Sequence, residues 1–364
     1  MTIKEICTSF NVEGKYVGCK EIPTGNINST YDVTFTNEEK VNRYIVQRVN
    51  KKVFTQPEKV MENIVNVTEH VSGKIRGQGL SESKFVLHVL CAKLDGKPFV
   101  KDDEGEYWRC YDFIKNAVTF DSTDDLGIIE RAGGAFGKFQ MCLDGFDART
   151  LNETIPNFHN TAARYNAFHE AIKVDPFNRV KKVSQEVEKC FSLEERATKL
   201  QRLLDNGDIP LRVTHNDTKC NNVSFDKNTG EALAVLDLDT VMAGAIAHDF
   251  GDAIRFIANT LIEDDPNVDE VALDLRKYEA FTKGYVSELK DVLTVSEKRT
   301  LNLGVFAMTV ELAIRFLTDY ILGDKYFKVK YPGHNIDRTR NQLALAEDIL
   351  KKSAVMDAIL QKYC

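Results

Sequence analysis

The 364-residue sequence lacks several features that mark whole classes of protein. Its eight cysteines are scattered without a C-x-x-C pair, which argues against both a zinc site and a disulfide framework. It has no apolar run of about 18 residues, so no membrane-spanning helix is expected. The first residues, MTIKEICTSFNVEGK, have neither the apolar core nor the small-residue cleavage site of a secretory signal. Together these absences predict a cytoplasmic protein with reduced thiols.

A large excess of charge of one sign is also absent. The 48 Lys and Arg residues face 55 Asp and Glu residues, which gives a net charge of −7 at neutral pH. This small negative charge provides no attraction to nucleic acids or anionic membranes, so neither is expected as a partner. The 43% apolar and 28% charged residues are typical of a globular protein. The length suggests two domains or one bilobal unit, and a monomer is expected.

Two kinds of hydrophobic pattern divide the sequence into two parts. The first 115 residues mostly alternate as half-buried strands do, clearest at 31–35 and 44–49, and Pro57 opens one helical pattern. Further strands are predicted at 85–94 and 106–114. From about residue 120 helical periodicity dominates, and its clearest segments are 158–172, 183–206, 253–262, 276–289 and 297–322. We therefore predict an α+β protein with a small β-rich N-lobe (1–115) and a larger, mainly α-helical C-lobe (116–364).

Three short predicted strands, at 212–215, 222–225 and 232–236, interrupt the helical part. The first two enclose the sequence HNDTKCNN, which runs from His215 to Asn222 with the spacing H-x-D-x-K-x-x-N. Asp237 ends the third strand, 15 residues after Asn222. A loop between two short strands, followed by a hairpin that ends in an Asp, would bring these polar groups to one point.

These residue types match the requirements of phosphoryl transfer from Mg-ATP. The reaction needs a carboxylate near the accepting hydroxyl, oxygen ligands for Mg²⁺ and cations along the phosphates. Asp217 can supply the carboxylate, and Lys219 can supply one cation. Asn222 and Asp237 can hold the metal ion. His215 is better interpreted as a brace for the loop than as a base. ATP and Mg²⁺ are therefore the predicted cofactors.

The loop resembles the catalytic loop of the protein kinase-like fold, in which protein kinases carry H-R-D-x-K-x-x-N and a later D-F-G. Here the metal Asp lies in DLD and no A-P-E follows, so the chain is more similar to the aminoglycoside phosphotransferase and choline kinase family. Within that family it resembles the N-acetylhexosamine 1-kinases. The similar stretches, spread from about residue 25 to 341, include GNINSTY, IVQRVN, PEKVMENI, WRCYDFI, ETIPNFHNT, LDLDTVMAG, HDFGDAIRF and FLTDYILGDKYF.

The resemblance implies a bilobal protein kinase-like fold whose N-lobe binds ATP. The segment from Gly25 to Tyr31 stands where the glycine-rich phosphate loop belongs, but it has one glycine rather than three. Side chains are therefore expected to contact the phosphates, and the candidates are Asn28, Ser29 and Thr30. Arg48 stands where kinases place the phosphate-binding Lys. Its expected ion-pair partner is Glu62, with Glu58 as a rival, and the hinge expected to bind adenine includes Phe113 and Ile114.

For the C-lobe, the resemblance implies a sugar pocket beside Asp217 that is lined by Phe256, Arg315 and Tyr326. The implied reaction transfers the γ-phosphate of ATP to the anomeric hydroxyl of an N-acetylhexosamine, which becomes the sugar 1-phosphate. Asp239 is an additional candidate ligand for the metal ion. Two alternatives stay open at this point. The acceptor could be a different sugar, an amino alcohol or an aminoglycoside, or the chain could be a nucleotide-binding pseudokinase.

Two further motif-like segments are not assigned to the site. Asp249-Phe-Gly spells DFG, but it lies 32 residues after Asp217, whereas Asp237 lies 20 after it. We expect Asp249 to cap the next helix and to brace the catalytic loop. Gly133-Gly-Ala-Phe-Gly-Lys138 hints at a Walker loop, but its glycine spacing is wrong. Phe139 also stands where a Ser or Thr would have to hold magnesium.

Overall fold

The computed structural model describes residues 1–23, 27–37, 40–79 and 85–364. Gly25, the predicted glycine of the phosphate loop, lies outside the described residues. The chain forms two compact units. The small unit comprises Met1–Val118, Arg149–Pro156 and Ser224–Met242, and the large unit comprises Thr119–Ala148, Asn157–Val223 and Ala243–Cys364. The small unit thus contains the predicted N-lobe, and two later segments of the chain join it.

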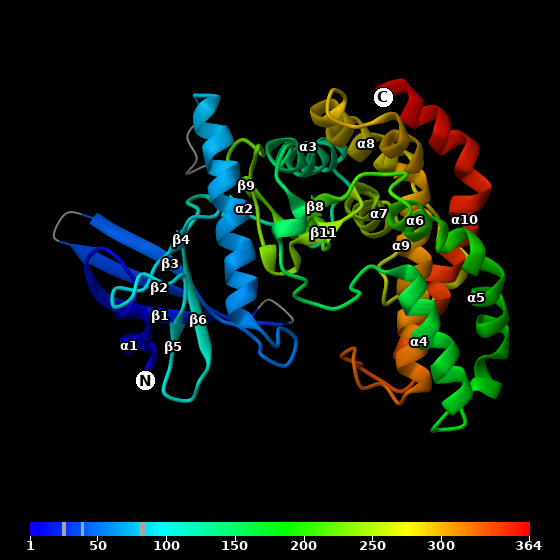
Figure 1. Ribbon diagram of the computed structural model, residues 1–364, viewed down its shortest axis with the longest axis horizontal. Helices are drawn as coiled ribbons and strands as arrows, with labels where there is room; N and C mark the ends of the chain where they lie inside the picture. Colours follow the sequence, from blue (N-terminus) through cyan, green and yellow to red (C-terminus); the bar gives the residue numbers. More distant parts are fainter. Residues whose placement is uncertain (24–26, 38–39, 80–84) are drawn as a thin grey trace. The chain divides into compact units, whose positions relative to one another are not determined.

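An antiparallel sheet forms most of the small unit (Figure 1). Its strands are β1 (Lys15–Ile22), β2 (Ser29–Asn37), β3 (Lys40–Arg48), β4 (Val89–Leu90), β5 (Val100–Lys101) and β6 (Tyr107–Asp112). The order is β1-β2-β3-β6-β4, and β5 also pairs with β6. Alternate apolar residues, such as Val33 and Phe35 in β2, pack on one core with helix α1 (Ile3–Thr8). The period-two alternation in the sequence is the cause of this one-sided burial.

Helix α2 (Pro57–Gly77) carries the second core of the small unit. Pro57 stands at its first turn, where a missing N–H costs nothing. Asn63 is buried on this helix, and its amide donates to the carbonyl oxygens of Asn152 (2.8 Å) and Val241 (2.9 Å). These two bonds fasten the later segments of the chain to α2. A second sheet has the order β10-β9-β7, with β7 (Ala117–Val118), β9 (Val223–Asp226) and β10 (Ala232–Val235).

The large unit is mostly helical (Figure 1). Its helices are α3 (Leu126–Cys142), α4 (Thr161–Val174), α5 (Ser184–Ala197), α6 (Lys199–Asp205), α7 (Ile246–Ile257), α8 (Leu275–Leu289), α9 (Val295–Ile321) and α10 (His334–Tyr363). Strand β8 (Arg212–Thr214) pairs with β11 (Met242–Gly244). The sheet-rich N-terminal region and the helical C-terminal region confirm the predicted α+β class.

Helix α9 is the central helix of the large unit, and it packs against α4, α5, α7 and α10. By length and composition it could cross a membrane. However, 83% of its most apolar 18-residue window is buried within the protein, as in the core helix of a globular fold. The burial extends around the helix and includes the carboxylate of Glu311, which has no exposed surface.

Glycines allow two pairs of helices to touch backbone to backbone. A Cβ atom on Gly133 or Gly137 of α3 would overlap the backbone of α8. A Cβ atom on Gly251 of α7 would overlap the carbonyl of Gly304 of α9, and one on Gly304 would overlap α7. The glycines that hinted at a Walker loop are therefore a helix-packing surface.

Some predicted elements differ from the structure. The strand predicted at 85–94 is reduced to Val89–Leu90. The helix predicted at 183–206 is two helices, with a break at Thr198, whose hydroxyl donates to the carbonyl of Glu194 (2.8 Å). Helix α7 begins at Ile246 instead of 253. All but one of its residues are buried, because its polar residues Asp249, Asp252 and Arg255 face other protein groups instead of solvent.

Candidate active site

The HNDTKCNN segment forms a loop in the large unit, directly after β8. Asn216 adopts a left-handed conformation (φ 65°), which Asn tolerates better than most residues. His215 and Thr218 are completely buried. The side chains of Asp217 and Lys219 keep 29% and 36% of their surface exposed. The loop is therefore largely buried, but it exposes one carboxylate and one ammonium group.

Asp217 sits between two hydrogen-bond donors. Its Oδ1 pairs with Nζ of Lys219 (2.9 Å), and its Oδ2 accepts from Nδ2 of Asn222 (3.2 Å). Burial raises the pKa of the Asp217 carboxyl, but the charge and hydrogen bond of Lys219, the nearby His215 and the hydrogen bond from Asn222 together hold the pKa below its usual value. Asp217 is thus an ionised acceptor that can bind and orient a hydroxyl group, and Lys219 stays charged beside it.

Asn222 fits a metal ligand. It ends the short helical turn Cys220–Asn222, and its Nδ2 donates to the backbone oxygen and the carboxylate of Asp217 (2.8 and 3.2 Å). Within the described part of the chain, its Oδ1 accepts no hydrogen bond, so the oxygen that Mg²⁺ prefers is available. The described residues contain no group of three or more His, Cys, Asp or Glu side chains that could hold a metal ion by themselves.

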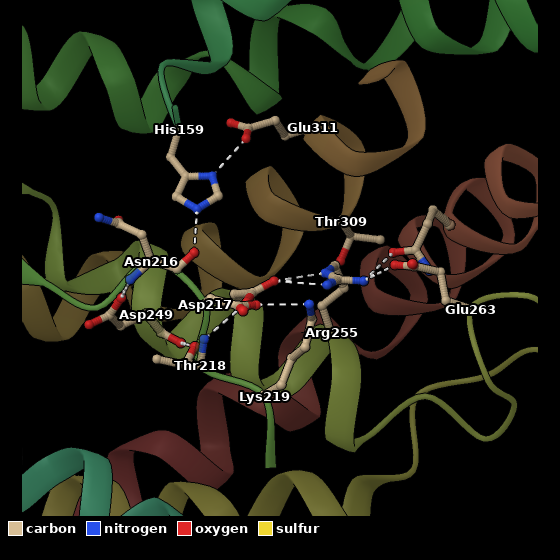
Figure 2. A network of polar contacts seen from close by, with 12 residues as sticks. His159, Asn216, Asp217, Thr218, Lys219, Asp249, Arg255, Glu263, Thr309 and Glu311 are labelled. Atoms are coloured by element: carbon tan, nitrogen blue, oxygen red, sulfur yellow. Dashed lines mark hydrogen bonds and ion pairs between the residues drawn. The ribbon is translucent and has the colours of Figure 1, made fainter. Parts of the chain in front are cut away.

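Asp249 holds the catalytic loop from α7 (Figure 2). Its two carboxylate oxygens accept the backbone N–H groups of His215 and Asn216 (both 2.8 Å) and the side-chain amide of Gln140 (2.6 Å). Figure 2 shows the contact with Asn216. Burial raises the pKa of Asp249, in opposition to these hydrogen bonds. The expected bracing contact is therefore present, but the expected helix cap is not. The N-cap of α7 is Ala245, and Asp249 lies inside the first turn.

A second carboxylate of α7 holds the next part of the loop. Oδ2 of Asp252 accepts the backbone N–H of Thr218 (3.2 Å), and its Oδ1 accepts from Arg255 (2.9 Å). Arg255 also pairs with Glu263 (2.5 Å), and its guanidinium is almost fully buried. Figure 2 shows this network beside Asp217 and Lys219. Asp249 and Asp252, which lie about one turn apart on α7, thus accept the backbone N–H groups of His215, Asn216 and Thr218.

His159 holds the loop from another direction. Its Nε2 donates to the carbonyl oxygen of Asn216 (3.0 Å), and its Nδ1 contacts Oε1 of Glu311 (2.8 Å). Burial opposes ionisation of Glu311, but the charges of His159 and Arg315 lower its pKa to about 2. Both ring nitrogens of His159 therefore lie within hydrogen-bonding distance of oxygen atoms, one on α9 and one in the loop.

His215 packs as a brace, as expected. Its ring meets Phe136 and Phe139 edge-on at centroid distances of 5.7 and 6.2 Å. Its Nδ1 accepts the backbone N–H of Asp217 (3.3 Å). This ring has no exposed surface, so it cannot meet a substrate directly.

Asp237 and Asp239 belong to the small unit. Asp237 is exposed and adopts a left-handed conformation (φ 55°), which is a strained geometry often found at functional sites. Asp239, an additional candidate ligand for the metal ion, is buried, and its oxygens contact other protein groups. Its oxygens pair with the guanidinium of Arg109 and accept from Nδ2 of Asn28 (2.6 Å). Burial alone would lower the pKa of Arg109, but the nearby groups, chiefly the Asp239 carboxylate, raise it above its usual value, so the guanidinium stays charged.

The polar contacts of Asp239 continue toward the expected phosphate loop. Arg109 donates to Gln47 (2.9 Å), and Gln47 donates to the hydroxyl of Thr30 (3.0 Å). Both polar atoms of the Asn28 side chain are used inside the small unit, since its Oδ1 accepts the N–H of Asn50 (3.0 Å). Asn28 is therefore placed as an anchor of this loop.

Arg48 is exposed at the end of β3, where its guanidinium donates to the hydroxyl of Ser29 (3.2 Å). The ion pair expected between Arg48 and Glu62 is not formed among the described residues. Glu62 instead accepts from the amide of Asn152 (3.0 Å), and Glu58 accepts from the hydroxyl of Tyr107. Within the described ranges, no carboxylate therefore holds the guanidinium of Arg48.

The expected hinge residues follow β6. The N–H of Phe113 donates to the carbonyl of Arg43 (3.2 Å), and the Arg43 guanidinium lies over the Phe113 ring at 3.6 Å. Ile114 is half-buried beside it. Their contact with adenine remains a prediction.

Arg315 and Tyr326 come together in the large unit. The Arg315 guanidinium lies near the rings of Phe158, Phe327 and Tyr326, at 5.2, 5.7 and 6.0 Å. It also lies 3.7 Å from Glu311. Tyr326 is 64% exposed and forms an open edge of this cluster. Phe256 lines a cavity of about 240 Å³ with Arg255, and the described residues around that cavity include neither Arg315 nor Tyr326.

Several residues that shape this site were not predicted from the sequence. In the large unit they are His159, Asp252, Arg255, Glu311 and Asp319, and in the small unit Arg109. Asp252 lies 34 positions from Thr218, and Glu311 lies 152 positions from His159. No local spacing marks these residues as a group, although all of them except Glu311 lie within stretches that carry the resemblance.

Comparisons with known proteins identify the fold and the family. Similar solved structures include a choline kinase from Cryptosporidium parvum Iowa II, with 14% identity, a TM-score of 0.57 and 99% coverage of both chains. A second is a putative aminoglycoside phosphotransferase from Ralstonia eutropha, with 12% identity, a TM-score of 0.58 and 96% coverage of both chains. A third is a spectinomycin phosphotransferase in complex with ADP and spectinomycin, with 12% identity, a TM-score of 0.51 and coverage of 92% of this chain and 94% of that chain.

At these identities the likeness concerns the fold, and it confirms the predicted kinase-like architecture. The model of one protein family, described as the phosphotransferase enzyme family, matches residues 18–283. The matched segment contains both the HNDTKCNN loop and Asp237, and it covers well over half of the sequence. The chain therefore belongs to the phosphotransferase enzyme family.

Proposed function

We propose that this protein is an ATP-dependent small-molecule kinase that phosphorylates the anomeric hydroxyl of an N-acetylhexosamine. The observation that carries the proposal is the Asp217 carboxylate, which is ionised, partly exposed and flanked by Lys219 and Asn222. A kinase of this kind needs little covalent chemistry from the protein, because positioning and charge stabilisation supply most of the rate enhancement. A rigid carboxylate beside a cation and an amide oxygen suits that task.

In the proposed reaction, Asp217 accepts a hydrogen bond from the sugar hydroxyl and aligns its oxygen with the γ-phosphorus. As the new O–P bond forms, Asp217 takes the hydroxyl proton, and the bond from the γ-phosphorus to the β-phosphate oxygen breaks to release ADP. Lys219 neutralises charge on the transferred group. Asn222 and Asp237 would hold Mg²⁺, which supplies charge neutralisation at the β- and γ-phosphates. Ser29, Thr30 and Arg48 would contact the phosphates, and Phe113 and Ile114 would border the adenine.

The acceptor side favours a neutral molecule over a cation. Arg315 and Arg164 lie so close that the charge of Arg315 adds to burial in lowering the pKa of Arg164. A choline or aminoglycoside cation would meet two guanidinium groups at this place, whereas a sugar can accept hydrogen bonds from them. The exposed ring of Tyr326 offers an apolar face of the kind that packs on a pyranose.

The decisive experiment measures ADP release from Mg-ATP across N-acetylglucosamine, N-acetylgalactosamine, glucose, galactose, choline, ethanolamine and kanamycin. We expect turnover only with the N-acetylhexosamines, together with loss of the reducing end of the sugar. Turnover with choline or kanamycin would show that the acceptor is not a sugar. It would also contradict the assignment of Arg315 and Tyr326 to sugar binding. ATP binding without turnover on any acceptor would favour the pseudokinase alternative.

A further inference from the structure

One face of α9 carries three charged residues at intervals of four positions: Glu311, Arg315 and Asp319. Residues four apart on a helix lie one above the other, at a rise of about 6 Å per step. Glu311 and Asp319 are buried, and Arg315 keeps only 10% of its side chain exposed. Charged side chains are rarely buried in this way unless they are paired.

The first of these residues reaches the catalytic loop. Glu311 contacts Nδ1 of His159 (2.8 Å) and accepts from the hydroxyl of Thr161 (2.8 Å). Nε2 of His159 in turn donates to the carbonyl of Asn216, the residue directly before Asp217. Figure 2 shows this chain of contacts from α9 through the imidazole to the loop. The backbone next to the proposed catalytic carboxylate is therefore tied to α9.

The third residue organises the segment that carries Tyr326. Oδ1 of Asp319 accepts the backbone N–H groups of Lys325 and Tyr326 (both 2.8 Å). Oδ2 accepts the N–H of Phe327 (2.9 Å) and the side-chain amide of Asn335 (3.0 Å). One carboxylate thus binds three consecutive N–H groups. Hydrogen bonds to an ionised acceptor are about twice as strong as neutral ones.

Arg315 lies on α9 between Glu311 and Asp319, which we call the two anchors. It is close both to Glu311 and to the segment that Asp319 holds. It lies 3.7 Å from Glu311, and it also lies near the rings of Tyr326 and Phe327. The catalytic loop and the Tyr326 segment are therefore both tied to α9, so this helix determines the distance between them. Because α9 is packed on most sides, it has little freedom to bend.

We propose that Glu311, Asp319 and His159 are positioning residues. Glu311, Arg315 and Asp319 form a ladder along α9, and this ladder holds the acceptor molecule at a fixed distance from Asp217. Glu311 sets the catalytic carboxylate, Asp319 sets the Tyr326 segment, and Arg315 contacts the acceptor between them. This inference rests on the proposed function, because it assigns the Arg315–Tyr326 cluster to the acceptor.

Two substitutions at His159 separate its two contacts. In His159→Gln the amide nitrogen reaches the place of Nε2 and can still donate to the carbonyl of Asn216. In His159→Asn the amide reaches only the place of Nδ1, so the contact with the loop is lost. We expect His159→Asn to lower kcat by about ten- to a hundredfold, since small displacements of a reacting group have effects of this size. His159→Gln restores most of the rate.

Asp319→Asn tests the other end of the ladder. The new amide places N–H groups against the N–H of Phe327, so the Tyr326 segment moves. We expect the KM for the acceptor to rise about tenfold, while the KM for ATP stays within about twofold. Glu186→Gln is the matched control. Glu186 is also a largely buried carboxylate, and its described ion pair, with Arg340 at 2.7 Å, involves neither anchor.

The measurement combines steady-state kinetics with amide hydrogen exchange of the wild type and the four variants. Exchange is expected to increase at 325–327 in Asp319→Asn and at 216–218 in His159→Asn, and at neither place in Glu186→Gln. Equal kinetic changes in Asp319→Asn and Glu186→Gln would overturn the ladder, as would a rise in the KM for ATP that matches the rise for the acceptor.

Failure of the proposed function gives a different result. If the wild type phosphorylates another acceptor, the same kinetic comparison is made with that acceptor. If it phosphorylates none, hydrogen exchange alone decides: unchanged protection at 325–327 and at 216–218 would overturn the ladder, and local loss of protection would support it.

Discussion

The catalytic loop of the large unit and the phosphate-side residues of the small unit are held in different ways. Buried carboxylates of α7 accept the backbone N–H groups of the loop, and His159 holds its carbonyl. By contrast, the side chains of Ser29 and Arg48 are joined by a single hydrogen bond at an exposed strand end. From this difference we expect the proposed catalytic carboxylate to be positioned before the substrate binds, whereas the side chains of Ser29 and Arg48 can adjust to the proposed nucleotide.

The two regions also share a structural feature, a buried ion pair. Each has one buried arginine paired with a buried aspartate: Arg255 with Asp252 in the large unit and Arg109 with Asp239 in the small unit. In both places the aspartate also accepts a hydrogen bond from a functional loop, from the N–H of Thr218 or the amide of Asn28. Buried pairs of this kind are costly to break, because the remaining charge is left without a partner.

The largest effect is expected when the pre-positioned carboxylate loses its charge. Asp217→Asn keeps the shape of the side chain but cannot take a proton, so kcat should fall by roughly 10²- to 10⁴-fold. The dissociation constant for ATP, measured by calorimetry, should stay within about twofold. A kcat close to that of the wild type would contradict the assignment of Asp217.

The next largest effect concerns the buried pair of the small unit. Asp239→Asn leaves the Arg109 guanidinium buried without a counter-charge, so the free energy of unfolding should fall by about 3–5 kcal/mol. Urea unfolding measures this loss. Asp32→Asn is the control, since Asp32 pairs with the more exposed Arg43 and its loss should cost less than about 1 kcal/mol. An unchanged stability combined with a higher requirement for Mg²⁺ would show that Asp239 is a metal ligand instead.

A smaller effect is expected at Arg48, which is proposed to contact the phosphates of ATP. Arg48→Ala removes one charged hydrogen-bond donor, so the KM for ATP should rise about tenfold while kcat changes little. Lys40→Ala removes a cation from the start of the same strand and should leave the KM for ATP unchanged. If Arg48→Ala lowered kcat as strongly as Asp217→Asn does, the contrast between the two regions would fail.

The smallest effect at neutral pH is expected for His248, which lies in α7 next to His159. Burial, together with the charge of His159, lowers the pKa of His248 to about 4. An unfolded chain binds this proton below about pH 6.5, whereas the folded protein resists it until about pH 4. The free energy of unfolding should therefore decrease as the pH falls from about 6.5 to 4, by up to about 1.4 kcal/mol per pH unit from this group.

His248→Gln should make that dependence shallower and leave stability at pH 8 nearly unchanged, apart from local packing. Unfolding by urea at a series of pH values measures the slope. An identical slope in the wild type and the variant would show that His248 does not titrate in this range.

The sequence was sufficient for the fold class and for the loop from His215 to Asn222 between two short strands, because both depend on short-range patterns. Alternation in β2 and β3 marks the sheet, and the spacing from His215 to Asn222 marks the loop. It was insufficient for the residues that hold the loop, such as His159 and Glu311, which are 152 positions apart. Their pairing depends on how α4 and α9 pack. The ion pair predicted between Arg48 and Glu62 is not formed among the described residues, where both side chains are exposed and each hydrogen-bonds to a neutral group.

The contact between Gly251 and Gly304 has a mechanical consequence. With no side chains between them, the backbones of α7 and α9 are in direct contact at this point, so we expect the two helices to move together as one stiff beam. The α7 part of this beam carries the carboxylates that accept the N–H groups of the catalytic loop, and seven residues beyond Gly304 stands Glu311. Thermal vibration should then displace both supports of the loop together, so the orientation of Asp217 is preserved while the surrounding elements fluctuate.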